Sequence, residues 1–143
     1  MKIVDLLSSD VDKIVELYEK NFADGWNKSM LESAFNSGRF ICIGIEEENK
    51  LIGLISCSTT DFDADIEGIT IDKDFRRNGF AKALLGLLEV KLKEKNIEKI
   101  FLEVRESNVP AKKLYLSAGY NEINKRKKYY SDGEDSVIMA KEL

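Results

Sequence analysis

Residues 69–81 read Ile-Thr-Ile-Asp-Lys-Asp-Phe-Arg-Arg-Asn-Gly-Phe-Ala, and this stretch decides the fold. Its β-branched start is typical of a strand, and an apolar helical stripe begins directly after it. A short polar turn with two arginines and Gly79 joins the two. The first amides of a helix have no intrahelical partner, and the aligned peptide dipoles add about half a positive charge there. Because glycine lets a ligand approach the backbone, the stretch predicts a phosphate-binding turn, although an ordinary strand-to-helix loop has the same residue types.

The segments on both sides of this turn predict a mixed α/β fold. Strands are expected at 2–7, 40–46, 51–58, 66–72, 99–104, 120–128 and 134–141. Helices are expected after the cap residues Ser9 and Asp10, at 28–37, at 79–95, and from Asn108 to Gly119. Two successive passages from strand to helix, at 71–80 and 104–110, would bring helix N-termini to the carboxyl ends of strands. Open α/β sheets bind ligands at such an edge, so we expect the functional site there.

Length and composition favour one domain over 1–143. The chain has 143 residues and a single proline, and it shows no repeat, linker or low-complexity segment. It contains no apolar run of the ~20 residues that a membrane span requires, and no signal-peptide pattern. Cys42 and Cys57 lie in apolar runs without the spacing of a metal site or a disulfide scaffold. We therefore expect a soluble, cytoplasmic protein with reduced cysteines and no membrane contact.

The charge and the histidine content exclude several functional classes. The sequence holds no histidine, which removes Ser-His and Cys-His nucleophiles and the usual histidine metal sites, so no metal is expected. The formal charge of -4 argues against broad nucleic-acid binding. The basic run 125–128 is the local exception, and it is typical either of a solvated hairpin face or of an RNA contact.

Four residues beyond the turn are candidates for catalysis or ligand binding. Glu103 stands between two apolar residues near a strand end, where it is either a solvent-facing residue or a general base at the rim of a cleft. Asn108, Ala111 and Tyr115 have helical spacing and share one face. Asn108 can cap the helix or hold a ligand amide, and Ala111 is small enough for a ligand to pass. Tyr115 is either a half-buried core aromatic or a hydroxyl that donates a proton.

Together these residues resemble the GNAT superfamily of N-acetyltransferases. The pattern Arg76-x-x-Gly79-x-Ala81 is similar to motif A of that superfamily. The segment 102–108 resembles more closely the RimI branch, which acetylates ribosomal proteins at the N-terminus. Further matches to that branch are Trp26, Ala111, Leu114-Tyr115, Gly119-Tyr120, Arg126, Tyr129-Tyr130, Gly133, Glu134-Asp135 and Ile138-Met139. The resemblance covers nearly the whole chain and is strongest over 66–140.

The resemblance implies a fold and a co-substrate. The GNAT fold is a central twisted, mostly antiparallel sheet of about seven strands, flanked by about four helices. The resemblance implies acetyl-CoA as acetyl donor, with the backbone of Ile69, Thr70 and Ile71 holding its pantetheine arm. The pyrophosphate would lie on the amides of Arg76, Arg77, Asn78, Gly79, Phe80 and Ala81, and Asn108 and Ala111 would be further cofactor contacts. Asn78 and Ala81 differ from the residues most common in the family, and both leave the turn workable.

The resemblance also assigns catalytic and acceptor-binding positions. Glu103 matches the base and Tyr115 the acid, and Trp26, Tyr129 and Tyr130 would line the acceptor groove. An α-amino group, with a pKa near ~8, becomes neutral more readily than a lysine side chain near ~10.4. The resemblance to the RimI branch implies direct acetyl transfer to the N-terminal α-amino group of a protein, such as a ribosomal protein, and this pKa difference agrees with it. Residues 25–27 read Gly-Trp-Asn, where that branch commonly has Pro-Trp-Ser.

Alternative functions remain compatible with these residues. The acceptor could be a small amine or a lysine side chain, or the chain could bind acetyl-CoA without turnover. RNA binding through 125–128 is a further alternative, which the net charge of -4 disfavours. The edge strand of the C-terminal hairpin is compatible with a monomer or a weak dimer.

Overall fold

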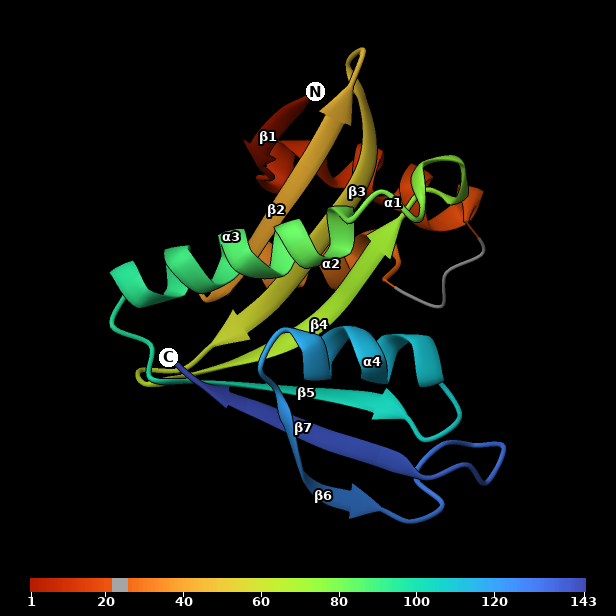
Figure 1. Ribbon diagram of the computed structural model, residues 1–143. Coiled ribbons are helices and arrows are strands. Elements are labelled where there is room, and N and C mark those ends of the chain that lie inside the picture. Colours follow the sequence, from red (N-terminus) through yellow and green to blue (C-terminus); the bar gives the residue numbers. More distant parts are fainter. Residues whose placement is uncertain (22–25) are drawn as a thin grey trace.

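The computed structural model describes residues 1–21 and 26–143 (Figure 1). Its strands form a seven-stranded sheet in the order β1-β2-β3-β4-β5-β7-β6. The strands are β1 (Lys2–Asp5), β2 (Phe40–Glu47), β3 (Lys50–Thr59), β4 (Asp63–Ile71), β5 (Lys99–Arg105), β6 (Asn121–Arg126) and β7 (Ser136–Glu142). The α-helices are α1 (Val11–Lys20), α2 (Lys28–Asn36), α3 (Phe80–Glu94) and α4 (Val109–Ser117). All neighbouring strands are antiparallel except β4 and β5, which confirms the expected mixed α/β fold.

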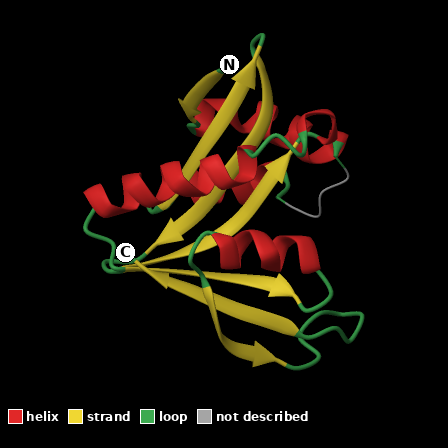
Figure 2. Cartoon of the chain, in the orientation of Figure 1, coloured by secondary structure: helices red, strands yellow, loops and turns green. Residues whose placement is uncertain are grey.

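Helices cover both faces of the sheet (Figure 2). The leucine stripe of α3 packs on one face, where α4 also lies, and Ile55 of β3 belongs to the same core. Leu54, the residue before Ile55, packs on the other face against α1 and α2. Successive side chains of a strand point to opposite faces, so the continuous apolar run of β3 fills both cores. In the described part of the chain, none of the helices has the length and apolar character needed to cross a membrane.

The ends of several elements differ from those predicted. β4 begins at Asp63 rather than at Ile66, and its first residues pair with both β3 and β5. Two short 3-10 helices, η1 (Ser8–Asp10) and η2 (Lys73–Phe75), were not predicted. The Asp10 carboxylate accepts a hydrogen bond from the Leu7 amide at 2.8 Å and so stabilises η1 rather than capping α1.

The sheet opens between β4 and β5. These parallel strands pair only at their beginnings, over Asp63–Lys99, Ala64–Ile100 and Asp65–Phe101. Beyond these pairs they diverge, so that β4 remains beside β3 while β5 follows β7 (Figure 1). The opening lies at the carboxyl ends of both strands, the edge at which the sequence predicted a functional site.

Candidate active site

A cavity of about 710 Å³ lies on the face of the sheet that carries α3 and α4, and we call it the front cavity. The carboxyl end of β4, the turn 76–79, the first turn of α3 and one face of α4 form its walls. Its lining residues are Asn21, Ile69, Thr70, Ile71, Phe75, Arg76, Arg77, Gly79, Phe80, Ala81, Lys82, Pro110, Ala111, Leu114 and Tyr115. The structure thus brings together the predicted donor-binding residues other than Asn78 and Asn108.

The backbone of the turn 76–79 leaves space in front of the helix N-terminus. Gly79 is the N-cap of α3 and has a φ of 77°, in the left-handed region that favours glycine. A Cβ at this position would meet no atom of the described residues within 4 Å. Arg76, Arg77 and Lys82 surround this space with positive charge. A diphosphate is therefore well suited to the site in both shape and charge.

Asn78 and Asn108 stabilise the protein's own backbone. The Asn78 side-chain amide donates to the Phe75 carbonyl at 3.0 Å. The Asn108 side-chain oxygen accepts a hydrogen bond from the Ala111 amide at 3.2 Å and caps α4, with Pro110 in the first turn. The helix cap that the sequence offered for Asn108 is thus present.

Tyr115 projects from α4 into the front cavity. It is half-buried, and its ring lies 6.0 Å from that of Tyr120 in an edge arrangement. Burial raises the pKa of the Tyr115 hydroxyl above its usual value, so the group is protonated at neutral pH. Tyr115 can therefore donate a hydrogen bond to a ligand atom in the cavity.

The opposite face of the sheet carries a second hollow of about 760 Å³, which we call the rear hollow. Its lining residues are Ser58, Asp65, Ile66, Glu67, Phe101, Leu102, Glu103, Ile123, Asn124, Arg126, Tyr129, Tyr130 and Ile138. Glu103 reaches this side because its neighbours Leu102 and Val104 pack in the core beneath α3 and α4. The site therefore has two sides, with Tyr115 lining the front cavity and Glu103 the rear hollow.

Glu103 is held by neighbours of the rear hollow. The Ser136 hydroxyl donates to Glu103 Oε2 at 3.4 Å, and Arg126 Nε lies 3.6 Å from Oε1. The Arg126 guanidinium also lies over the Tyr129 ring, 5.3 Å from its centroid. These contacts connect Glu103 with the loop between β6 and β7, which carries Tyr129 and Tyr130.

Trp26 lies apart from the two tyrosines. It lines a neighbouring hollow of about 490 Å³ beside α2, which we call the side hollow. Its ring centroid lies 5.4 Å from that of Phe40. The side and rear hollows share Ser58 and Glu67, so they adjoin each other. The three predicted acceptor residues thus lie along adjoining hollows rather than in one pocket. Residues 22–25, which precede Trp26, lie outside the described residues.

Two carboxylates of the rear hollow, Asp65 and Glu67, were not predicted as site residues. The pairing of β3 with β4 shifts between Ser56 and Cys57, which leaves Glu67 as the extra residue of a β-bulge. Burial raises the pKa of Asp65, and the negative charges of Glu67, Asp63 and Glu103 add to the shift. Acidic residues at positions 63, 65 and 67 of a strand were the available sequence signal.

The two sides of the opening differ in charge. Cationic side chains and a helix N-terminus surround the front cavity, whereas three carboxylates, Asp65, Glu67 and Glu103, outnumber the single cation Arg126 in the rear hollow. An anionic ligand and an amine could therefore approach each other from opposite faces of the sheet. Among the described residues, no group of three or more carboxylates and thiols has metal-binding geometry.

Two side chains of the basic run 125–128 form ion pairs with acidic neighbours. Lys125 pairs with Glu106 at 3.4 Å, and Arg126 pairs with Glu103. The Lys128 amide donates to the Asp135 carboxylate at 2.9 Å. These contacts, on a strand whose residues are all exposed, are compatible with a solvated hairpin face.

Comparison with known proteins agrees with this geometry. Residues 11–120 match the acetyltransferase (GNAT) family. A [ribosomal protein bS18]-alanine N-acetyltransferase from Haemophilus influenzae is 36% identical over 98% of this chain and 98% of its own length. The crystal structure of the Escherichia coli ribosomal-protein-S18-alanine N-acetyltransferase superposes with a TM-score of 0.91 at 29% identity, covering 99% of this chain and 93% of that one. Ard1 from Thermoplasma volcanium, at 21% identity, a TM-score of 0.85, and coverage of 99% of this chain and 97% of that one, shares the fold. This chain therefore belongs to the GNAT family of acetyltransferases.

Proposed function

We propose that this protein, acting as one catalytic domain over 1–143, transfers the acetyl group of acetyl-CoA to the N-terminal α-amino group of a polypeptide. The observation that carries the proposal is the opening between β4 and β5, which has a cationic cavity on one side and a carboxylate-lined hollow on the other. A donor and an acceptor that enter from opposite faces would meet at this opening. Such positioning alone can supply a large share of the rate enhancement.

The front cavity fits the donor. The amides at the start of α3 would bind the pyrophosphate, with Arg76 and Arg77 beside them. The diverging edge of β4 at Ile69 to Ile71 offers backbone groups to the amides of the pantetheine arm. Ala111 leaves room on α4, and the acetyl end would then lie near Tyr115.

Glu103 would take up a proton, and Tyr115 would stabilise the leaving group. Glu103, directly or through water, accepts a proton from the acceptor ammonium, and the neutral nitrogen attacks the thioester carbonyl. The new bond joins nitrogen to the acetyl carbon, and the bond between carbon and sulfur breaks. Tyr115 donates its hydroxyl hydrogen bond to the departing thiolate. The pKa of a tyrosine already exceeds that of a thiol, near ~8.5, and burial raises the pKa of Tyr115 further, so its contribution is this hydrogen bond rather than proton transfer. The nitrogen loses its second proton as the amide forms, and water carries that proton to the thiolate.

The acceptor side supports a polypeptide N-terminus. The carboxylates of Asp65, Glu67 and Glu103 would attract a protonated amine, and an α-amino group releases its proton more easily than lysine does. The adjoining side hollow with Trp26 gives room for residues that follow the acetylated one. The relatives named for alanine acetylation of ribosomal protein bS18 support an N-terminal alanine of a ribosomal protein as the acceptor.

The test is a thiol-release assay with purified protein, acetyl-CoA and a panel of peptides with free N-termini. We expect fastest release with peptides that begin with alanine. The matched control is the same peptide with a blocked N-terminus and an internal lysine, and small amines form a further arm. Turnover of the blocked peptide or of a small amine in preference to free N-termini would overturn the assigned acceptor. Binding of acetyl-CoA without thiol release in any arm would overturn catalysis.

A further inference from the structure

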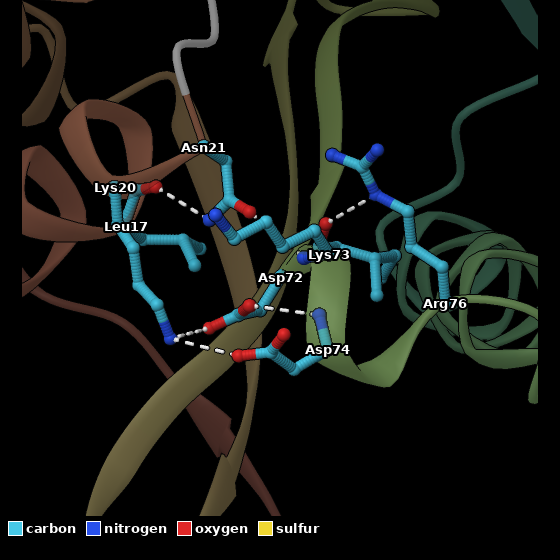
Figure 3. Close-up of polar contacts among 8 residues, drawn as sticks. Leu17, Lys20, Asn21, Asp72, Lys73, Asp74 and Arg76 are labelled. Atoms are coloured by element: carbon cyan, nitrogen blue, oxygen red, sulfur yellow. Dashed lines mark hydrogen bonds and ion pairs between the residues drawn. The ribbon is translucent and has the colours of Figure 1, made fainter.

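The last turn of α1 is fastened to the chain that follows β4 (Figure 3). Lys20 Nζ lies 2.6 Å from Asp72 Oδ2 and 3.6 Å from Asp74 Oδ2. The Asp72 side chain is 4% exposed, whereas that of Lys20 is 48% exposed. Lys20 thus reaches from the surface to a buried carboxylate, and among the described residues it alone forms an ion pair with Asp72.

Asn21 makes a second connection beside the first. Its side-chain nitrogen donates to the Leu17 carbonyl at 2.9 Å, and its side-chain oxygen accepts from the Lys73 amide at 2.8 Å. Asn21 thereby joins the end of α1 to the first residue of η2 (Figure 3). Both functional ends of its amide are engaged with the protein backbone.

The fastened segment leads directly into the turn 76–79. Asp72 caps η2 by accepting from the Asp74 amide at 3.1 Å, and the Phe75 amide donates to the Asp72 carbonyl at 2.8 Å. Arg76 Nε then donates to the Ile71 carbonyl at 3.0 Å, closing the loop from 71 to 76. The start of the turn therefore depends on Asp72, which in turn is held by Lys20.

The backbone conformation of the turn 76–79 needs support from its surroundings. Arg77 has a φ of 66°, in the left-handed region that side chains other than glycine rarely adopt. Such a backbone persists only where its surroundings fix it. A turn that is already fixed binds a ligand more tightly, because less ordering is required on binding.

The ion pair is charged at neutral pH. The hydrogen bond to Asp72 raises the pKa of Lys20. Burial works to raise the pKa of Asp72, but the hydrogen bonds from Lys20 and from the Asp74 amide outweigh it, so the pKa of Asp72 is lowered. Lys20 does not line the front cavity, so it acts on a donor there through the carboxylates that it contacts, of which Asp72 is the closer.

We propose that Lys20 is a positioning residue for acetyl-CoA, which holds the turn 76–79 in its phosphate-binding form through Asp72, with Asn21 as a second fastening. The inference rests on the proposed function, because it takes the front cavity to be the acetyl-CoA site. Its specific consequence concerns the phosphates: loss of Lys20 weakens donors that carry the pyrophosphate and leaves donors without it unaffected.

The experiment compares Lys20→Met with the matched control Lys13→Met. Lys13 lies on the same helix, has a 50% exposed side chain and pairs with Glu46 at 3.3 Å rather than with Asp72 or Asp74. For Lys20→Met we expect the Kd and KM for acetyl-CoA to rise about tenfold at unchanged kcat. S-acetyl-pantetheine, which lacks the phosphates, should react equally well with both variants. Lys20→Arg should restore acetyl-CoA affinity.

A second variant distinguishes a folding defect from a loss of turn positioning. Lys20→Met with Asp72→Asn removes both charges while keeping an acceptor for the Asp74 amide, and thermal unfolding reports whether it folds. A folded double variant with weakened acetyl-CoA binding supports the proposal. Equal acetyl-CoA affinity in Lys20→Met and Lys13→Met, or equal losses with both donors, overturns it. A wild-type protein that binds no acetyl-CoA overturns the proposed function and this inference with it.

Discussion

Tyr115 of α4 and Tyr120 just after it contact each other edge to face, and only Tyr115 lines the front cavity. Tyr115 lines the front cavity, whereas the Tyr120 hydroxyl is buried and has no hydrogen-bond partner among the described residues. Sequence alone predicted Tyr115 through helical spacing and family resemblance. It did not predict Asp65 and Glu67, because a bulge decides which way the side chains of β4 point, and no local pattern encodes a bulge.

This contrast gives a matched pair of substitutions. Tyr115→Phe should lower kcat about 100-fold, since the hydrogen bond to the departing sulfur is lost, with little change in the Kd for acetyl-CoA. Tyr120→Phe removes a hydroxyl that makes no hydrogen bond and should keep kcat. Steady-state kinetics and calorimetry on the two variants check this, and an unchanged kcat in Tyr115→Phe would remove it from the reaction.

Glu103→Gln tests the base on the other side of the opening. The substitution keeps an acceptor for the Ser136 hydroxyl but cannot take up a proton, so kcat/KM should fall about 100-fold. Glu122→Gln, on an exposed position of β6, is the control. The kinetics should be measured from pH 6 to 9, because a base that deprotonates an α-amino group matters most below that group's pKa of ~8. Equal rates for the two variants would contradict the assigned role.

At the scale of elements, the sequence predicted the α-helices, but it did not predict the start of β4 or the 3-10 helix η2. The leucine stripe of α3 and the Asn108-Pro110 start of α4 lie where the sequence predicted them, because spacing and capping are local. The first residues of β4, 63–65, and the short helix η2 were missed. The first forms through its ladder with β3 and β5, and the second is held by Asp72 and by α1, so both depend on distant segments.

Two glycines of the same helix test how the turn works. Gly79→Ala should destabilise the protein by about 1–2 kcal/mol, because its φ of 77° is unfavourable for a side chain. It should also weaken acetyl-CoA binding, since the new methyl group enters the space in front of the amides. Gly86→Ala, at an open position of α3, should stabilise by about 0.5–1 kcal/mol without affecting binding. Chemical denaturation and calorimetry measure both; tighter binding by Gly79→Ala would contradict the turn's assigned role.

At the scale of the whole molecule, the sequence predicted the strands but not the opening between them. Predicted elements placed Glu103 and Tyr115 near one edge, yet the sheet separates them onto opposite faces. The divergence of β4 from β5 makes an opening through which the front cavity and the rear hollow could connect. That divergence depends on the pairing of β4 with β3 and of β5 with β7.

The two cores make the thiols a probe of global unfolding. Cys42 is 3% exposed and Cys57 is 0% exposed, each in a different core. Burial raises the pKa of both thiols to about 12, so neither should react with a thiol reagent at pH 8 until the protein unfolds. Unfolded chains release these protons near pH ~8.5, so stability should fall as pH rises from there toward 12. Reaction of either thiol at the rate of a free cysteine in the native protein would contradict this.

The short pairing of β4 with β5 also has a consequence for hydrogen exchange. Along 66–71, alternate backbone amides face β3, and the others face the opening, where β5 no longer runs beside them. In the free protein these latter amides should exchange rapidly although they lie in the middle of a sheet. Acetyl-CoA should slow them selectively, whereas amides between β5 and β7 should keep the same protection with and without it. The interior of this sheet would then behave as an edge whose missing strand is the substrate.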